Sequence, residues 1–418
     1  MKVGLPLASV DEANFVLDHP GQVNVFLVAG LIAEGGFVGA GGTPDIGALR
    51  RALRARIAAL PQLRRVAVKD GRRHRWLDVS PDLDDHIRLN APVDGLAGLE
   101  RLCGELMSVP LPTDRPLWEL LIVPGARVAG VGVVLRIHHA VADGMAAVSI
   151  VQKLFDPTAT SVRPAPEPRQ GAAKPARGLR SILSRFVFGL TRIRMTLGGR
   201  EVGSTILLGE RGPHRGVAFL SVDLAAVEAH ARTSGATVND ALLAAVASGY
   251  RSALAAAGEE IPARLPVSVP VALPRRGDAA NQVGVMLVRL PLDEPDADER
   301  LRLIAMQTRP AKIQAREQGT LEFMRGPVGA RLIDHLARRQ HLVAGFVTDV
   351  PGPTGRMHLA GAPVEALWPV AVLAANVRLG VAAISYAGRL WCSVHFDADI
   401  VPGDVFSRAM GEELTRLG

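Results

Sequence analysis

The chain has 418 residues, which is too long for one compact core and predicts two domains. Hydrophobic residues make up 48% of it and charged residues 21%, so a mostly disordered protein is excluded. The only two cysteines, Cys103 and Cys392, exclude a disulfide framework and a metal site built from paired cysteines. The net charge of +7 is compatible with nucleic acid, an anionic lipid surface or a phosphorylated small molecule as partner.

The N-terminal residues lack the basic and then apolar pattern of a signal peptide, and Asp11 and Glu12 follow soon after. No uninterrupted apolar run approaches the roughly 18 residues that a membrane-spanning helix needs. The scarcity of cysteine fits a reducing compartment. We therefore expect a cytoplasmic protein that does not cross a membrane.

In the first half, apolar residues at helical spacing predict helices over 46–60 and 96–107. Residues 131–137 are an apolar run typical of a buried strand. The segment from His138 to Gly144 follows directly, and helical spacing resumes over 145–155. This motif is therefore predicted to lie on a turn between a strand and a helix.

Between the two halves lies a segment of different composition. Five prolines between Pro157 and Pro175 prevent regular structure and indicate a linker. We expect a first domain over 1–156, a linker with a crossover helix over 157–215, and a second domain over 216–418.

Residues 163–215 hold eleven Lys or Arg against three acidic residues. Apolar residues recur at helical spacing between the arginines, which predicts a basic amphipathic helix over Arg180–Arg200. The helix either lies on an anionic membrane or lipid-body surface, or packs between the domains with a solvated basic face. Nucleic-acid binding is not expected, because no recognition motif accompanies the charge and aromatic residues are only 4%.

The second half alternates strands and helices. Predicted strands cover 216–224, 267–271, 283–290, 342–348, 364–367, 377–386 and 390–396, and predicted helices cover 225–234, 238–257 and a long stretch from about 297. This alternation in both halves predicts an α/β or α+β architecture.

The chemistry is carried by the histidine turn. A histidine at the end of a rigid strand, with Asp143 four residues after it, suits general base catalysis, because imidazole titrates near neutral pH. Asp143 can fix the loop or the ring, and Gly144 lets the chain turn into the helix. From spacing alone, core histidines bonded to carbonyl groups are an equal alternative. A metal site is not expected, because His138 and His139 point to opposite faces of an extended segment.

With six further blocks in chain order, the motif His138-His139-Ala140-Val141-Ala142-Asp143-Gly144 makes the chain resemble the bacterial wax ester synthase/diacylglycerol acyltransferase family. The further blocks lie at residues 83–88, 115–119, 237–240, 281–284, 290–291 and 350–353. The resemblance implies two chloramphenicol acetyltransferase-like domains, each with a mixed sheet flanked by helices, and an active-site channel at their interface. It implies that His139 is the general base, that His138 accompanies it, and that Asp143 is more often structural than catalytic.

Further site residues are implied by the same resemblance. Pro116, Leu117 and Trp118 would shape the channel wall, although packing alone also explains them. Asn239 and Asp240 would lie near the active site, with Asn239 as a donor to the oxyanion; the alternative is a helix N-cap and a first-turn carboxylate.

The sequence also departs from the family at four positions. Asp18 stands where the family usually has a glutamate, and Asn24 where it has a histidine. Asp349 and Gly380 each replace an asparagine. These changes leave the histidine turn intact and bear on the choice of acceptor.

The activity implied is transfer of a fatty acyl group from a coenzyme A thioester to the hydroxyl of a long-chain alcohol or diacylglycerol, without a covalent intermediate. Acyl-CoA would be a co-substrate, and neither a permanently bound cofactor nor a metal is expected. Two alternatives remain: a tailoring acyltransferase that esterifies a specialised metabolite from a CoA or carrier-protein donor, and a non-catalytic lipid-surface protein. The expected location is cytoplasmic, with Arg180–Arg200 as a candidate peripheral contact to the inner membrane or lipid bodies.

Overall fold

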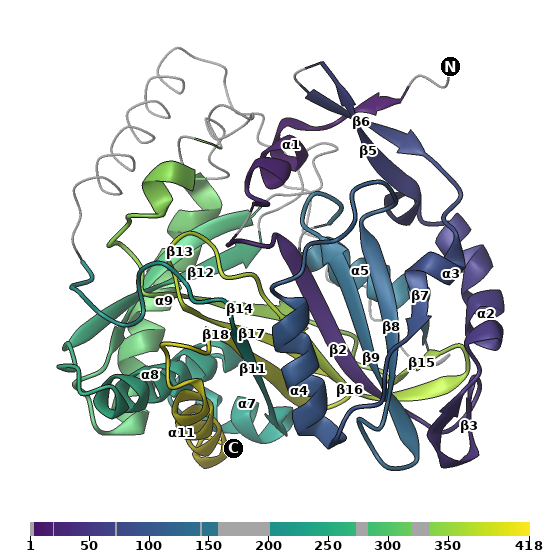
Figure 1. Cartoon of the computed structure of the whole chain (residues 1–418). Helices are drawn as coiled ribbons and strands as arrows, with labels where there is room; N and C mark the ends of the chain where they lie inside the picture. The colour runs from purple at the N-terminus through teal and green to yellow at the C-terminus, as the bar shows by residue number, and fades with distance from the viewer. Residues whose placement is uncertain are drawn as a thin grey trace.

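The computed structural model describes residues 4–19, 21–71, 73–142, 144–157, 201–272, 283–318, 331 and 334–418. This part of the chain forms two large sheets that lie side by side, with helices over their outer faces (Figure 1). The arrangement of mixed sheets flanked by helices confirms the predicted fold class.

The first large sheet has seven strands and carries the histidine turn. In spatial order its strands are β10 (Asp156–Pro157), β15 (Met357–Leu359), β16 (Ala362–Val370), β2 (Val25–Ala33), β9 (Gly130–His138), β8 (Trp118–Pro124) and β7 (Ile87–Leu89). Every residue of β9 is buried, which agrees with its continuous apolar sequence.

Two strands of this sheet come from late in the chain. β16 pairs antiparallel with β2, from Val364 opposite Ile32 to Val370 opposite Leu27. The hydroxyl of Tyr386 fixes the arriving segment, because it donates to the carbonyl of Val364 at 2.9 Å and accepts from the amide of Met357 at 2.9 Å. The two sheets therefore do not separate at the linker, and the boundaries at 156 and 216 remain predictions.

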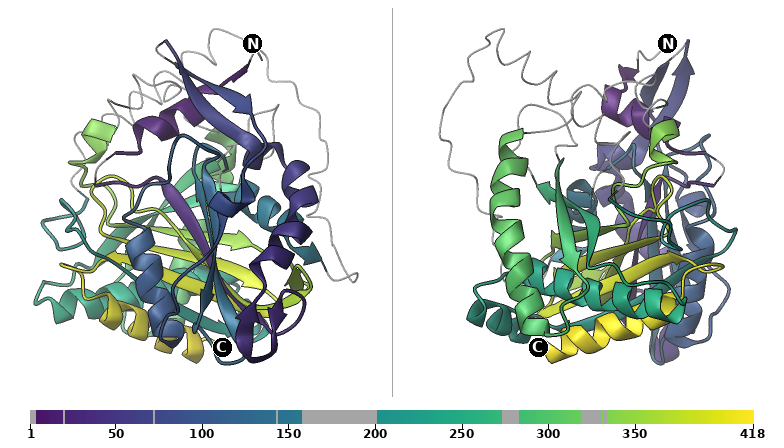
Figure 2. Two further views of the ribbon diagram at one scale, coloured as in Figure 1. Left: turned by 45° about the vertical axis from the view of Figure 1, so that its right-hand side comes forward. Right: turned by 90° about the vertical axis from the view of Figure 1, so that its left-hand side faces the viewer.

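The second large sheet has six strands. In spatial order they are β11 (Arg215–Asp223), β18 (Arg389–Asp397), β17 (Leu379–Tyr386), β14 (Gly345–Pro351), β12 (Arg264–Ala272) and β13 (Val283–Pro291). The helices that accompany it are α7 (Leu224–Thr233), α8 (Val238–Ala256), α9 (Ala297–Gln318) and α11 (Gly403–Arg416). Figure 2 shows α9 standing beside β12 and β13 while α11 runs along the base.

The first half adds its own helices and two small sheets. The helices are α1 (Ser9–Val16), α2 (Ile46–Ala58), α3 (Leu83–His86), α4 (Gly95–Leu106) and α5 (Gly144–Leu154), with short 3₁₀ turns at Ala40–Gly42 and Pro61–Arg64. β1 (Leu5–Pro6), β6 (Arg73–Asp78) and β5 (Arg65–Asp70) form one small sheet, and β3 (Val38–Gly39) with β4 (Thr43–Pro44) forms the other.

Helix α4 connects the two halves. Its apolar face packs between the first sheet and β11, where Leu99 and Cys103 contact Val217 and Val370 in one buried cluster. Gly104 permits this approach, because a Cβ atom there would collide with the carbonyl oxygen of Arg215. The helix thus buries its face against both halves of the chain.

Most predicted elements are confirmed within one to three residues at their ends, including the turn that carries the histidines. The sequence analysis did not identify α1, β2, β8 or α11. In the family block at 350–353, Val350 and Pro351 are the last residues of β14 and pair with β17. The predicted helix over Arg180–Arg200 lies outside the described residues, as does Asp143. Within the described ranges, no helix combines the length and apolar character that a bilayer crossing requires.

A buried ion pair holds β8, β9 and the end of α4 together. Arg136, on β9, is 2% exposed and pairs with Glu119 on β8. Arg136 also donates to the carbonyls of Leu106 and Val109. Glu119 forms a second ion pair, with Arg88, at 2.6 Å. These contacts satisfy a charge that is otherwise costly to bury.

Replacing Glu119 with alanine would leave the guanidinium of Arg136 buried without its carboxylate. We expect Glu119→Ala to lower the free energy of unfolding by about 3–5 kcal/mol. The matched control is Glu228→Ala, which removes an exposed partner of Arg232 and costs about 0.3–0.5 kcal/mol. Urea unfolding followed by circular dichroism measures both losses, and equal losses would contradict the role given to Glu119.

Candidate active site

The end of β9 delivers the two histidines. β9 ends at His138, and His139 begins the turn that leads to Gly144, the first residue of α5. Backbone bonds fix the turn from both sides: the amide of His138 donates to the carbonyl of Leu117, and the amide of His139 donates to the carbonyl of Asn24, each at 3.0 Å. The two neighbouring strands therefore determine where each ring points.

His138 is locked by its hydrogen bonds. Its Nδ1 accepts from the amide of Ala140 at 3.0 Å, so the ring proton is on Nε2, which donates to Oδ2 of Asp18 at 3.2 Å. The ring also stacks on Phe15, with centroids 5.0 Å apart, and is 1% exposed. With both nitrogens engaged and the face covered, His138 is suited to positioning the turn.

His139 lies on the other side of the turn. Its ring is partly buried and meets Phe26 edge to face, with centroids 5.3 Å apart. Burial, followed by the proximity of His138, lowers the pKa of His139 from 6.5 to about 4. The imidazole is therefore neutral at neutral pH and able to accept a proton.

Asp18 lies against the turn, on the segment that follows α1. Burial raises the pKa of its carboxyl group, but hydrogen bonds from His138 and from the amide of Asn24 outweigh this, so the net pKa lies below its ordinary value. Asn24 in turn donates its side-chain amide to Asn14. Asp18 is thus an ionised partner of His138, and the structure brings these two predicted residues together.

The same segment contacts the second half of the chain. The side-chain oxygen of Gln22 accepts from the amide of Ala375 at 2.8 Å, and the carbonyl of Gly21 accepts from Arg211 at 3.0 Å. Arg211 also donates to the carbonyl of Ala375 at 2.7 Å. The support for the histidine turn therefore includes residues from both halves.

The predicted channel residues 116–118 pack behind the histidines. Trp118 is 2% exposed, donates its indole N–H to the carbonyl of Leu63 at 2.8 Å and stacks on His86 at 4.4 Å. Leu117 is fully buried, and the carbonyl of Pro116 accepts from the amide of Trp118. These contacts favour the packing interpretation, in which the motif fixes the backbone that His138 binds.

The predicted pair Asn239 and Asp240 begins α8, in the second half. The N-cap is Thr237, so the alternative of Asn239 as the N-cap is wrong. Asp240 completes the capping box with Thr237 and accepts from the hydroxyl of Thr308 at 2.7 Å. Nδ2 of Asn239 is buried and has no hydrogen-bond partner among the described residues.

A second charged cluster surrounds this helix start. Nζ of Lys312, on α9, lies 3.8 Å from Oδ1 of Asp240. Burial raises the pKa of Asp349, on β14, to about 6, although Lys312 opposes this shift. Among the described residues, no hydrogen bond or ion pair joins this cluster to the histidine turn.

Several residues around the turn carried no sequence signal. Phe15 and Phe26 are isolated aromatics in segments whose elements were not predicted, and their contacts with the histidines depend on how those segments fold. Lys312 and Thr308 lie on a helix rich in charged residues, where neither stands out. A polar residue at an otherwise apolar helical position is the signal that would have identified Thr308, which is fully buried.

Metal and thiol chemistry find no support in the part of the chain that the structure describes. No group of three or more His, Cys, Asp or Glu is arranged there to hold a metal ion. Burial raises the pKa of both Cys103 and Cys392, so these thiols stay protonated and unreactive.

Solved structures show the same architecture. The wax ester synthase/diacylglycerol acyltransferase of Marinobacter aquaeolei VT8 superposes with a TM-score of 0.73 at 20% identity, covering 99% of this chain and 98% of its own. The first condensation domain of the calcium-dependent antibiotic synthetase gives a TM-score of 0.60 at 16% identity, covering 100% and 96%. The chain therefore shares its fold with this acyltransferase and with the condensation domain.

Sequence comparison narrows the proteins that share this fold to one family. Residues 8–201 match the wax ester synthase/diacylglycerol acyltransferase catalytic domain, and residues 279–417 match the WS/DGAT C-terminal domain. A Mycobacterium tuberculosis H37Rv protein assigned as a diacylglycerol O-acyltransferase is 30% identical over 363 residues, which cover 77% of this chain and 75% of that protein. A second protein of this strain, tgs1, with the same assignment, is 29% identical over 377 residues, covering 82% and 81%. The chain belongs to the wax ester synthase/diacylglycerol acyltransferase family and is an O-acyltransferase.

Removing the carboxylate of Asp18 should loosen the histidine turn. We expect Asp18→Ala to lower kcat about 10- to 100-fold, because small displacements of a catalytic group cost rate steeply. Asp18→Asn keeps an oxygen that can accept from His138 and should retain most of the rate. Steady-state acyl transfer measures both variants, and an unchanged rate in Asp18→Ala would show that Asp18 does not position the turn.

Proposed function

We propose that this protein transfers a fatty acyl group from a coenzyme A thioester to the hydroxyl of a long-chain alcohol or a diacylglycerol, with His139 as the general base. The observation that carries the proposal is the state of His139: a neutral imidazole at the end of a buried strand, beside a histidine whose own nitrogens are engaged. Membership in the family supports the donor and acceptor classes.

In the proposed reaction the neutral imidazole of His139 removes the hydroxyl proton as the oxygen attacks the thioester carbonyl. The resulting imidazolium protonates the departing thiolate when the tetrahedral intermediate collapses, so the ester and free coenzyme A leave and His139 is again neutral. His138 and Asp18 hold the turn in place and exchange no proton with the substrate. No covalent enzyme intermediate is required.

Asn239 is the proposed donor to the oxyanion. Its Nδ2 group is buried without a partner, and it lies in the first turn of α8, where the helix dipole favours negative charge. An unpartnered buried amide is costly in a resting structure, which supports a role that is fulfilled only with substrate. Asn239→Ala should therefore lower kcat more than it raises KM.

A hydroxyl on a specialised metabolite is the second candidate acceptor. Asp349 favours it, because a partly buried carboxyl group with a pKa raised to about 6 stands where the family usually has an asparagine. Product analysis separates the two: neutral lipid from diacylglycerol or hexadecanol supports the first, and thioester hydrolysis without either ester supports the second.

We also propose that the enzyme is cytoplasmic and binds an anionic membrane or lipid-body surface through Arg180–Arg200. The support is the sequence pattern alone, since this segment lies outside the described residues. Co-sedimentation with anionic vesicles, with and without those arginines, decides it.

The base assignment is tested by thiol release from palmitoyl-coenzyme A with hexadecanol or diacylglycerol as acceptor. We expect His139→Ala to lower the acceptor-dependent rate by about 10²- to 10⁴-fold, the usual contribution of a general base. The control is His214→Ala, which removes an exposed histidine whose side chain is 75% exposed and should leave the rate unchanged. An active His139→Ala variant would refute the assignment.

The lowered pKa of His139 predicts an unusual acid limb. The base works only when unprotonated, so kcat/KM should stay flat as the pH falls through 6.5 and decline only towards about 4. A decline centred near 6.5 would show that His139 titrates as if exposed. Because a histidine buried in its neutral form also makes folding less favourable below pH 6.5, circular dichroism at each pH provides the control.

A further inference from the structure

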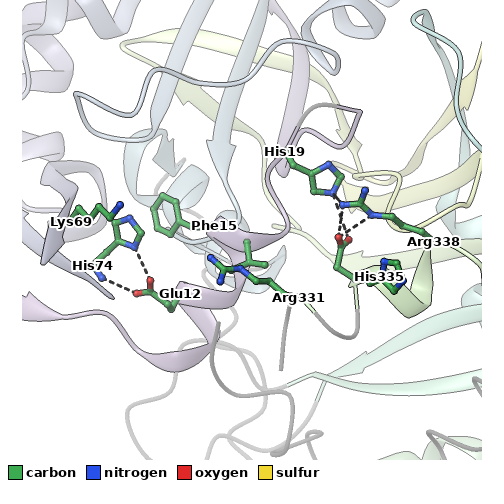
Figure 3. Close-up of a pocket in the computed structure, with 10 residues that line it drawn as sticks. Glu12, Phe15, His19, Lys69, His74, Arg331, His335 and Arg338 are labelled. Carbon is green, nitrogen blue, oxygen red and sulfur yellow. Dashed lines mark hydrogen bonds and ion pairs between the residues drawn. The ribbon is translucent and has the colours of Figure 1, made fainter. Parts of the chain in front are cut away.

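A cavity of about 580 Å³ lies beside the histidine turn, on the side of α1 (Figure 3). This volume is within the range of small-molecule sites. Its wall is built from α1, the β5–β6 hairpin and the segment around Arg338, three stretches far apart in the sequence. Phe15 and Val16 provide an apolar floor.

The two carboxylates in the wall already have partners. Both oxygens of Glu12 are used by His74, at 3.0 Å from its amide and 2.7 Å from its ring. Asp334 accepts from Arg338 at 3.0 Å, and His19 lies 3.6 Å away. Glu12 is 5% exposed and Asp334 7%, so these pairs are part of the wall.

Three nitrogen groups remain for a ligand. Lys69 from β5, and Arg331 and His335 from the other side, line the same cavity, and none has an ion pair or hydrogen bond among the described residues. Figure 3 shows Arg331 between the Glu12–His74 pair and the group formed by His19 and Arg338. The cavity wall thus carries an ammonium group, a guanidinium fork and an imidazole, together with the apolar side chains of Phe15 and Val16.

The cavity is coupled to the catalytic turn by a stack of three rings. His74 in the cavity wall stacks on Phe15 at 5.1 Å and 20°, and Phe15 stacks on His138 at 5.0 Å and 23°. Asp18, which binds His138, is next to His19, which lines the cavity. A ligand here lies directly behind the residues that position His139.

We infer that this cavity is a binding site for a phosphoryl group carried by one of the two substrates. A phosphate monoester has a charge of about −1.5 to −2 and three acceptor oxygens, which suits a cavity whose wall carries both an ammonium and a guanidinium group from different elements. A fatty carboxylate has a single charge and would leave one cation unpaired. The inference rests on the proposed function, because it takes its ligand from that reaction.

Two substrates offer this chemistry. The phosphates belong either to the nucleotide of the acyl-coenzyme A donor or to a phosphorylated lipid whose hydroxyl would take the place of the alcohol or diacylglycerol as acceptor. The apolar floor accommodates the adenine or pantetheine of coenzyme A, and equally the acyl chain of a lipid phosphate. Both ligands therefore fit the same cavity, and the binding experiment decides between them.

The test is isothermal titration calorimetry with the full chain. Wild type is compared with the Lys69→Ala/Arg331→Ala double variant, using coenzyme A and 3′,5′-ADP as donor probes and 1-oleoylglycerol 3-phosphate as acceptor probe. Monooleoylglycerol and pantetheine, which lack phosphate, are the reference ligands. Arg264→Ala/Arg408→Ala, which removes two exposed cations from β12 and α11, is the charge-matched control.

We expect Kd to rise about tenfold or more for one class of phosphorylated probe in the cavity variant, and to change less than about twofold in the control. Weakening confined to coenzyme A and 3′,5′-ADP assigns the donor, and weakening confined to the lipid phosphate assigns the acceptor. If wild type binds no phosphorylated probe, or the control variant weakens equally, or the phosphate-free ligands weaken as much, the inference is overturned.

Binding is measured without turnover, so this result is independent of the proposed reaction. An inert enzyme that binds phosphorylated probes through Lys69 and Arg331 contradicts the proposed function and leaves the cavity assignment intact. An active enzyme that binds the probes independently of Lys69 and Arg331 contradicts the cavity assignment and leaves the proposed function intact. Both positions are exposed, and circular dichroism confirms that the variants fold.

Discussion

The pairing of β2 with β16 is the constraint on which the rest of the structure depends. β2 lies between this late strand and β9, and its preceding residue Asn24 supplies the carbonyl that binds the backbone of His139. The position of His139, the proposed base, is therefore set by a sheet that both halves of the chain build. Tyr386 and the hydrogen bond between Gln22 and Ala375 strengthen the same junction. The family's two-part sequence pattern folds into one interlocked unit around the turn.

Desolvation acts differently on the groups of the turn. Burial removes water from His139, and no described residue forms an ion pair with it, so its neutral form is favoured. Asp18 is also desolvated, but two hydrogen bonds keep it ionised. His138 stands between them with a fixed tautomer. One turn thus holds the neutral imidazole of His139 next to His138, whose two ring nitrogens are both hydrogen-bonded.

The sequence was sufficient for the elements with strong periodicity and for the strand, turn and helix around His138, because those signals are local. It missed β2 and β8, although both are largely apolar, and α1, whose pattern is weak. Asp18 was identified through the family resemblance, and its contact with His138 depends on a segment 120 residues earlier folding back. The sequence predicted that Asn239 and Asp240 both lie near the active site. Only the folded structure shows that they differ, because Asp240 is bonded in the capping box and the side-chain amide of Asn239 has no partner among the described residues. The cavity was beyond prediction, because its wall comes from three distant stretches of the chain.

The donation of β16 to the first sheet also has a meaning for biosynthesis. As the chain leaves the ribosome, residues 25–33 have no partner on one side until residues 362–370 arrive. During that interval an apolar strand presents a free edge, which is a template for wrong pairing. Since such long-range closure is slow, the nascent first half is the stage at which this protein depends most on chaperones. Fragments that end in the linker would retain that open edge permanently, and aggregation is the fate we expect for them.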